Sequence, residues 1–490
     1  MLSIPGMDKG ILSGIEDGSR LSLRETGAAS SRARLAFGIV LVGSALQGYA
    51  NSSLSPIFIG LLVLVCGAAL VGMVFGWRRP EVHAFVLTYG SCVFVGGLAQ
   101  CYSLRIPQDP QEFGDAIYFF QQLSLRPPFP KVGLEGEAPM ALAVWQQAYT
   151  AAWALDLSPG LSLGVIVNAL TMGLTAAVTV ATARQLFGDD SWRLRRVGML
   201  FASCGLFLLF GSVLLRDCFV LLLNTIWLWA AVRWIVRPST ATLSLAVLVG
   251  IAAPALMPLL RPEAVPLFFV NGLIAALSWY GTRRLNGARV AVVVFAFIAL
   301  LIVIPQALEL RQTLQDVQAE SIEKYNQVSQ AESSEKSLGM RFIISQPLPV
   351  RLFTGNVLLL VGQIPLWANF SLNTGAYHWI RGYQTLYQLI VVPLAATGIF
   401  LVLRLLRTRG RRAVPWLFLL GCLVASDAAV VVTSLEARHL AASTTAFVIL
   451  AALPNTRDGC QRRDYHVICA AWFAMVCGVY LAWGVLKGLA

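Results

Sequence analysis

The sequence predicts an all-α fold, a polytopic transmembrane helical bundle of about 13 spans with interfacial helices and two long extracytoplasmic loops. Its composition is 57% hydrophobic and 13% charged over 490 residues, whereas a soluble domain carries about 25% charged residues. Apolar runs such as 57–77, 161–183 and 290–307 approach the ~20 residues that cross a hydrocarbon core of about 30 Å. Strands of a membrane β-barrel would instead alternate over about ten residues. The chain therefore cannot be a soluble enzyme.

The basic surplus has a topological explanation. The formal charge is +12 and the pI is about 9.5, and cytoplasmic loops of membrane proteins are enriched in Lys and Arg. No basic patch is interleaved with exposed aromatics, so nucleic acid is not expected as a partner. The nine cysteines lie mostly within apolar runs and form no CxxC pair. Neither a disulfide framework nor a zinc site is indicated.

Residues 1–34 are predicted to form a short cytoplasmic tail, because they are polar and lack the apolar core of a cleavable signal peptide. Residues 35–490 then form the transmembrane domain. Apolar length assigns its spans to roughly 36–52, 57–77, 84–103, 161–183, 197–215, 218–236, 240–259, 264–281, 290–307, 384–403, 413–433, 440–454 and 467–486.

Arginine-rich loops orient these spans. With the tail inside, every short, arginine-dense connection falls on the same side, as in 78–79, 184–196, 283–289 and 404–412. That asymmetry is the one expected of cytoplasmic loops. The sequence thus predicts a multi-pass inner (plasma) membrane protein with a cytoplasmic N-terminus.

Two apolar stretches, 140–155 and 352–366, cannot be full spans without placing an arginine cluster outside. We expect both to be helices at the extracytoplasmic interface, where Trp145, Tyr149 and Trp153 of the first would sit at headgroup level. They belong to the long extracytoplasmic segments 104–160 and 308–383. Loops of this length are usually functional.

Ionisable residues gather at three predicted extracytoplasmic hinges. Such residues at membrane depth are costly and usually functional. The first hinge is SVLLRDCFVLL, the second PLLRPEAVPL and the third SLEARHL, and the first long loop adds an acid. The candidates are Arg216 and Asp217, Arg261 and Glu263, Glu436, Arg438 and His439, and Asp115.

A structural role is the competing interpretation. An Arg–Asp or Arg–Glu pair in a short turn can cap helices and pair locally, and His439 can be a turn residue. Asp427, buried in its predicted span, could be satisfied by Ser426 or Thr433. Three charged hinges together favour function, because ordinary hinges would use Ser, Asn, Gly and Pro.

The functional interpretation is recognition of an anion by arginines beside a base. Arginine presents a planar, permanently charged fork that suits phosphate oxygens. Arg216, Arg261 and Arg438 at the lipid boundary would hold the phosphate of a lipid carrier. A carboxylate, Asp115 or else Asp217, would take the proton of an acceptor hydroxyl. No nucleotide-binding loop is present, so the donor would not be a nucleotide sugar.

The chain resembles the GT-C superfamily of membrane glycosyltransferases and the related bacterial polysaccharide polymerases. The likeness consists of the acidic loop QDPQEFGDAIYFF, the hinges LLRDCF and LLRPEA, and the late SSEKSLG, QPLPVR and QIPLW segments, and it covers most of 84–404. It departs from that pattern in the DxxExxD spacing of its acids and in two additional spans before them.

The resemblance implies a polyprenyl-phosphate or -diphosphate sugar donor, a glycan or lipid acceptor, and an inverting transfer on the extracytoplasmic face in cell-envelope or exopolysaccharide synthesis. It implies no organic cofactor and leaves a divalent metal as an open alternative, although no metal ligands are identified. Two other functions stay open. One is a polymerase or ligase of polyprenyl-diphosphate oligosaccharides, and the other is a transporter or flippase of lipid-linked sugars.

Overall fold

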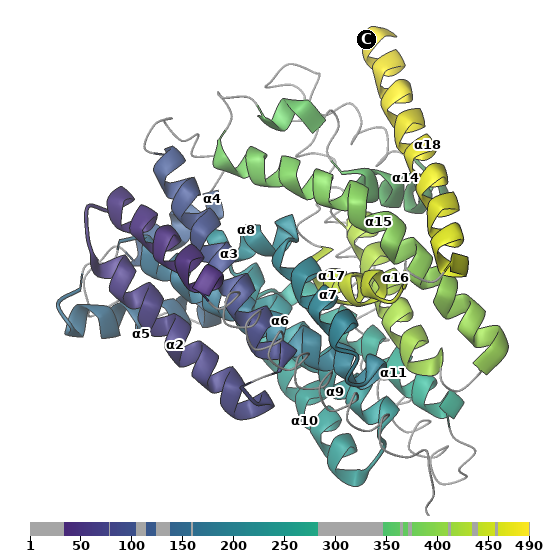
Figure 1. Ribbon diagram of the computed structural model, residues 1–490, viewed down its shortest axis with the longest axis horizontal. Helices are drawn as coiled ribbons and strands as arrows, with labels where there is room; N and C mark the ends of the chain where they lie inside the picture. Colours follow the sequence, from purple (N-terminus) through teal and green to yellow (C-terminus); the bar gives the residue numbers. More distant parts are fainter. Residues whose placement is uncertain are drawn as a thin grey trace, which may run out of the picture.

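A computed structural model of the protein describes residues 34–77, 79–103, 114–123, 138–157, 160–282, 346–362, 366–370, 375–409, 413–433, 440–455 and 459–489. All secondary structure within these ranges is helical, as predicted (Figure 1).

The elements, in chain order, begin with a helix over Arg34–Ala50. They continue with α2 (Ser55–Phe75), α3 (Pro80–Ser103), α4 (Gly114–Leu123), α5 (Pro139–Ala154), α6 (Ser162–Phe187), α7 (Ser191–Ala202), α8 (Gly205–Ser212), α9 (Asp217–Val236), α10 (Thr240–Leu256) and α11 (Val265–Thr282). The later helices are α14 (Leu348–Val361), α15 (Ala376–Arg409), α16 (Val414–Thr433), α17 (Ala441–Ala452) and α18 (Gly459–Leu489).

Membrane-spanning character is confirmed for much of the chain. Eight of the described helices are long and apolar enough to cross a membrane, and the bent pair α7–α8 makes a ninth. Three predicted spans correspond to shorter apolar helices, over Arg34–Ala50, Val265–Trp279 and Ser443–Ala452. The predicted span 290–307 lies outside the described residues. The chain is therefore a helical membrane protein, and thirteen spans stays a prediction.

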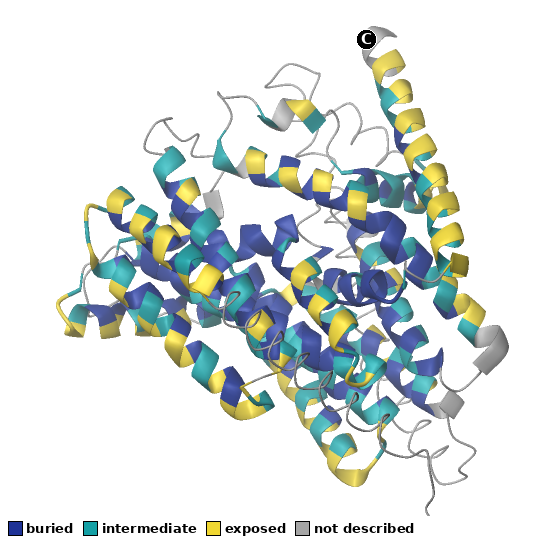
Figure 2. Ribbon diagram, in the orientation of Figure 1, coloured by how far each residue is buried: buried dark blue, intermediate teal, exposed yellow. Residues whose placement is uncertain are grey.

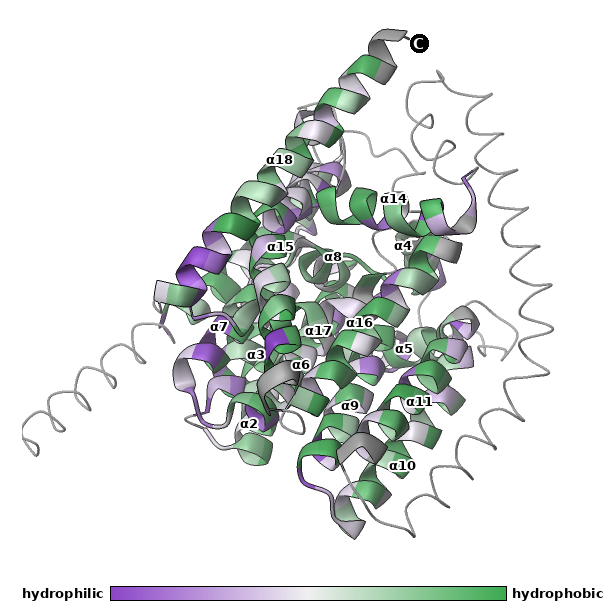
Figure 3. Ribbon diagram, turned by 90° about the vertical axis from the view of Figure 1, so that its right-hand side faces the viewer, coloured by the Kyte–Doolittle hydropathy of each residue, from purple (hydrophilic) through white to green (hydrophobic). Residues whose placement is uncertain are grey.

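Burial separates a central group of helices from a peripheral one (Figure 2). Of the most apolar 18-residue stretch of each helix, 78% is buried inside the protein in α6, whereas only 11% is buried in α18. The peripheral α18 exposes Val467, Phe473 and Leu481, and its surface is largely hydrophobic away from its polar start (Figure 3). Exposed apolar side chains on such a helix suit contact with lipid tails rather than water.

The span predicted over 197–215 is broken, which corrects the expectation of one continuous helix. Its halves, α7 and α8, are bent by 57°. The break is stabilised from α15, where Oε1 of Gln384 accepts a hydrogen bond from the amide of Leu206 (3.0 Å) and one from Sγ of Cys204 (3.7 Å). A glutamine thus satisfies a donor that the bend frees, as the membrane interior requires.

The helix bundle has two opposite ends, the hinge end and the loop end. The hinge end holds the α8–α9 connection and the α10–α11 connection. The loop end holds an ionic cluster in which Glu81, with no exposed surface, accepts from Arg184 (2.5 Å), and Asp189 pairs with Arg79 (3.0 Å) and Arg184 (3.5 Å). Arg79 and Arg184, which were both predicted to lie on the cytoplasmic side, therefore lie together at one end of the bundle.

Helix α5 confirms the helix predicted over 140–155, but Trp145 and Tyr149, two of its three aromatic residues, are buried in the protein. Trp145 has no exposed surface and Tyr149 is 2% exposed. The Tyr149 hydroxyl donates to the carbonyl of Gly160 (2.7 Å), and burial raises its pKa, so the hydroxyl stays protonated as a donor. The expectation for Trp145 and Tyr149 was wrong because both side chains pack into the protein.

Candidate functional site

The hinge end brings together two of the predicted charged residues. Nη1 of Arg261 donates to Oδ1 of Asp217 at 2.6 Å, joining hinges that are 44 residues apart in sequence. The side chain of Asp217 is 2% exposed and that of Arg261 is 15% exposed. A carboxylate this buried is tolerated only with a hydrogen-bonded, charged partner, and the second hinge provides it. Local pairing within one turn, the competing interpretation, does not describe this contact.

The backbone around Arg261 follows from its sequence. Arg261 precedes Pro262, and a residue before proline is driven out of the helical region. Its backbone is accordingly extended, with φ −158° and ψ 93°, between two short 3₁₀ turns, Met257–Leu259 and Pro262–Ala264. The LLRPEA motif therefore breaks the helix at the arginine itself, which places the arginine at the start of the connection to α11.

Asn168 of α6 fixes the other hinge. Its amide nitrogen donates to the carbonyls of Val213 (2.8 Å) and Leu215 (3.0 Å), which lie between α8 and α9. Its amide oxygen accepts from Nε1 of Trp145 (2.9 Å). Asn168 has no exposed surface, and this set uses both amide N–H groups and the carbonyl oxygen. The start of α9, where Asp217 stands, is thus held from α5 and α6.

An aromatic stack connects this hinge to the acidic first loop. Trp145 lies between Phe119 of α4, at 5.2 Å, and Phe219 of α9, at 5.6 Å, measured between ring centroids. Asp217 precedes Phe219 by two residues. Asp115 precedes Phe119 by four residues and stands in the first turn of α4. Through Trp145, the ring contacts therefore link the helix that carries Asp115 to the helix that begins at Asp217.

Arg216 differs from its neighbour in having no partner among the described side chains. It precedes α9 and is partly exposed. Among the described residues its guanidinium makes neither an ion pair nor a hydrogen bond. The hinge end thus combines one satisfied buried ion pair, Asp217–Arg261, with one adjacent cation that is available to an anion.

The remaining predicted site residues are placed only in part. Glu263 lies in the 3₁₀ turn Pro262–Ala264, and for Glu263 and Asp115 only the backbone is described. Glu436, Arg438 and His439 lie outside the described residues. The convergence of Arg438 with Arg216 and Arg261 stays a prediction.

Asp427 corrects one detail of the sequence analysis. Its Oδ1 atom is buried without a hydrogen-bond partner within the described chain, and so is the Ser426 hydroxyl. Ser426 therefore does not satisfy Asp427. No group of three or more His, Cys, Asp or Glu that could hold a metal occurs in the described ranges.

The role of Asn168 in holding the α8–α9 hinge, and the contacts of Trp145 with it, were not predicted from the sequence. The available signal was a lone amide within the otherwise apolar run 161–183, since a buried amide must find partners. Its three partners could not be named from the sequence, because they lie on α5 and on the α8–α9 hinge. Arg351 was also missed. It is 4% exposed, and its Nε donates to the carbonyl of Val431 (3.1 Å).

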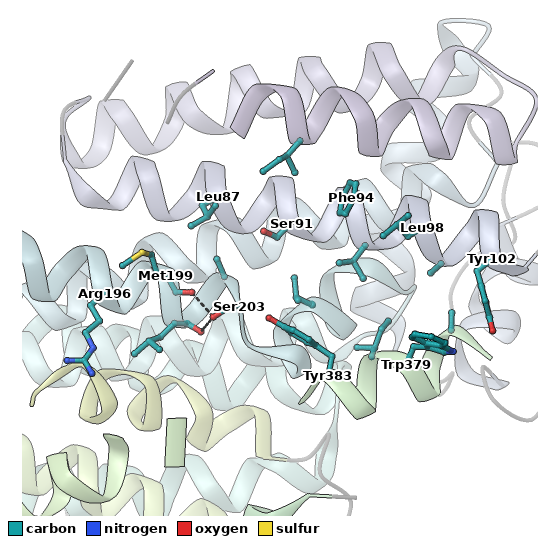
Figure 4. A pocket seen from close by; sticks show the side chains of 18 residues that line it. Leu87, Ser91, Phe94, Leu98, Tyr102, Arg196, Met199, Ser203, Trp379 and Tyr383 are labelled. Carbon is teal, nitrogen blue, oxygen red and sulfur yellow. Dashed lines mark hydrogen bonds between the residues drawn. The ribbon is translucent and has the colours of Figure 1, made fainter. Parts of the chain in front are cut away.

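A separate cavity of about 960 Å³ lies along α3, α7 and α15. We call it the α3–α7–α15 groove. Its lining is almost wholly apolar, and Figure 4 shows Arg196 at one end, with Tyr102 and Trp379 at the other. None of Arg216, Asp217 or Arg261 lines it. The predicted charged site and the groove are therefore two distinct features.

Comparison with known proteins adds no relative. No family model matches the chain, and neither a curated protein nor a solved structure matches it significantly.

Proposed function

We propose that this protein is a membrane glycosyltransferase that uses a polyprenyl-phosphate or -diphosphate sugar at the hinge end of its bundle, on the extracytoplasmic side. The observation that carries the proposal is the buried Asp217–Arg261 ion pair beside Arg216, which has no ion-pair partner within the described part of the chain. Two charged hinges distant in sequence are held together at considerable desolvation cost, which a structural turn would not require.

In the proposed reaction, Arg216 binds the phosphate of the donor, because its fork matches phosphate oxygens. An acceptor hydroxyl attacks the anomeric carbon, and the bond from that carbon to the phosphate oxygen breaks. The hydroxyl proton passes to a carboxylate, and polyprenyl phosphate or diphosphate leaves with the bonding electrons. Positive charge beside the leaving group stabilises the charge that develops there.

The buried position of Asp217 indicates that Asp217 and Asp115 have different roles. At 2% exposure, and with one oxygen engaged by Arg261, Asp217 serves best as a positioning residue that orients Arg261. Asp115, on the first turn of α4 beside the aromatic stack, is the proposed base. In this assignment the ring contacts of Phe119, Trp145 and Phe219 link the helix that carries the base to the hinge that binds the phosphate.

The test supplies purified protein in lipid nanodiscs with isotope-labelled polyprenyl-phosphate and polyprenyl-diphosphate sugars and a panel of acceptors. Release of the polyprenyl carrier together with a labelled product supports the proposal. We expect Arg216→Ala to lower kcat/KM by about 10- to 100-fold, the loss of a charge-assisted hydrogen bond of about 1.5–3 kcal/mol. Asp115→Asn should lower kcat with little change in KM.

Arg195→Ala is the matched control, because it removes an exposed arginine of α7 near the loop end. It should leave transfer unchanged. Transfer that survives Arg216→Ala combined with Arg261→Ala would eliminate the phosphate site. A ladder of lengthened glycans instead of single transfer would indicate the polymerase alternative.

The broken span α7–α8 supports a second candidate, a flippase of lipid-linked sugars. Broken helices are common at transporter binding sites, and this break, at Ser203 and Cys204, borders the α3–α7–α15 groove. Movement of a fluorescent polyprenyl-phosphate sugar across proteoliposomes containing the protein, without sugar release, would favour this function over transfer.

A further inference from the structure

The α3–α7–α15 groove contains one isolated positive charge. Of the 18 residues that line it, Arg196 is the only charged one. Arg196 lies on α7, three residues beyond Arg193, which pairs with Asp190 near the loop end (3.4 Å). An apolar groove with a single cation at one end is complementary to an amphiphile with an anionic head.

Arg196 has no carboxylate partner in the described chain. Three acidic side chains of the loop end pair with other arginines, Glu81 with Arg184, Asp189 with Arg79 and Arg184, and Asp190 with Arg193. Arg196 instead donates from Nη1 to the carbonyl of Pro454 (2.6 Å) and lies over the ring of Trp192 at 5.2 Å. That hydrogen bond uses one of five guanidinium N–H donors. A guanidinium without a carboxylate partner at the end of an apolar groove is suited to binding a phosphate.

The rest of the groove suits a hydrocarbon chain. Its residues on α3 run from Leu87 to Tyr102, a rise of about 22 Å at 1.5 Å per residue. One leaflet is about 15 Å deep, so the groove holds the head and the full chain of a lipid from one leaflet. Midway, the Tyr383 hydroxyl is turned toward Ser203 at the α7–α8 break (Figure 4). These hydroxyls are polar groups in the middle of a mostly apolar lining.

We propose that the groove is a binding site for an anionic glycerophospholipid, with its phosphate on Arg196 and an acyl chain extending toward Trp379. Basic pockets between membrane helices hold lipid phosphates in this way. The site lies apart from the charged residues of the hinge end. It is independent of the proposed sugar transfer, and lipid retention can be measured without a sugar donor.

The experiment measures lipid retained by purified protein. Protein extracted in detergent, stripped of lipid and incubated with phosphatidylglycerol, phosphatidylcholine, polyprenyl phosphate or inorganic phosphate is examined by native mass spectrometry. We expect saturable binding of one phosphatidylglycerol, at least tenfold tighter than phosphatidylcholine. Polyprenyl phosphate should compete weakly, and inorganic phosphate should not bind.

Two variants test the two halves of the site. Arg196→Ala removes the cation, and Ala99→Trp fills the apolar part of the groove. Each should weaken phosphatidylglycerol binding by tenfold or more, while Arg196→Lys should retain part of it. Ala482→Trp, on the exposed face of α18, is the control for added bulk and should bind like the wild type.

Several results would overturn the proposal. These are wild-type retention in both Arg196→Ala and Ala99→Trp, equal binding of phosphatidylcholine, or preference for polyprenyl phosphate over phosphatidylglycerol. If Arg196→Ala does not fold, Arg196→Lys and Ala99→Trp still decide the matter. Wild-type affinity in both of those variants would rule out the site.

Discussion

Arg261 and Asp217 form an ion pair across two hinges that are 44 residues apart, with Nη1 and Oδ1 separated by 2.6 Å. Arg261→Ala leaves the Asp217 carboxylate buried and uncompensated. Removing one partner of a buried pair costs about 3–5 kcal/mol, and we expect that loss of unfolding free energy in detergent or nanodiscs. Arg261→Ala combined with Asp217→Ala should recover much of it. An Arg261→Ala variant as stable as the wild type would mean that the pair does not form.

Asn168→Leu should destabilise the α8–α9 hinge. The change leaves the carbonyls of Val213 and Leu215 and the indole N–H of Trp145 without their partner, at about 1–3 kcal/mol for each buried group that stays unsatisfied. The matched control is Thr175→Val on the same helix, whose hydroxyl bonds only to the carbonyl of Thr171 one turn earlier. Unfolding free energies of both variants check this. A loss no larger in Asn168→Leu than in Thr175→Val contradicts the role of the amide.

Gly398→Ala should disturb the packing of α15 against α17. A Cβ at Gly398 would meet the backbone carbonyl oxygen of Leu450 at a distance that real side chains do not show. Because that neighbour is backbone, the helices must separate, at about 1–3 kcal/mol. Gly250→Ala on α10 meets nothing within 4 Å and should be neutral or slightly stabilising. Thermal unfolding of the two variants distinguishes these outcomes.

Glu81→Gln should lower the unfolding free energy much more than Asp189→Asn, although both acids pair with Arg184. The Glu81 side chain has no exposed surface, whereas that of Asp189 is 78% exposed. Loss of the buried charge should cost about 2–3 kcal/mol, because Arg184 keeps only its weaker partner. Loss of the exposed charge should cost less than about 1 kcal/mol. Equal effects on unfolding would show that burial does not govern this cluster.

Much of the fold could be predicted because membrane spans depend on local apolar length. The predicted span 218–236 matches α9 (Asp217–Val236), and 161–183 matches α6 within a few residues. The charged hinges were also visible, since Arg–Asp and Arg–Pro–Glu interrupt apolar runs. That Asp217 would pair with Arg261 rather than with Arg216 depends on the packing of α9 beside α10 and α11, which no local pattern encodes.

Other features could not be predicted because distant side chains determine them. The run 197–215 is apolar and contains no proline, and the only local sign of a break between α7 and α8 is the closely spaced Ser203 and Gly205. From its sequence position Trp145 is expected to be an interfacial aromatic residue. It is instead buried, where it donates a hydrogen bond to Asn168 and packs against two phenylalanines. The groove likewise forms mainly from α3, α7 and α15, with Ile39 and Leu208 from two other helices, and the fold as a whole sets their spacing.

The hydrogen bond from Leu206 to Gln384 has a consequence for how the chain is made. The two residues are 178 positions apart, and ribosomes add about 5–20 residues per second, so Gln384 emerges on the order of ten seconds or more after Leu206. Until then nothing caps the α8 amide, and the nascent α7–α8 segment can enter the bilayer as one straight rod. The bend would then be a late event of biogenesis, set when α15 arrives.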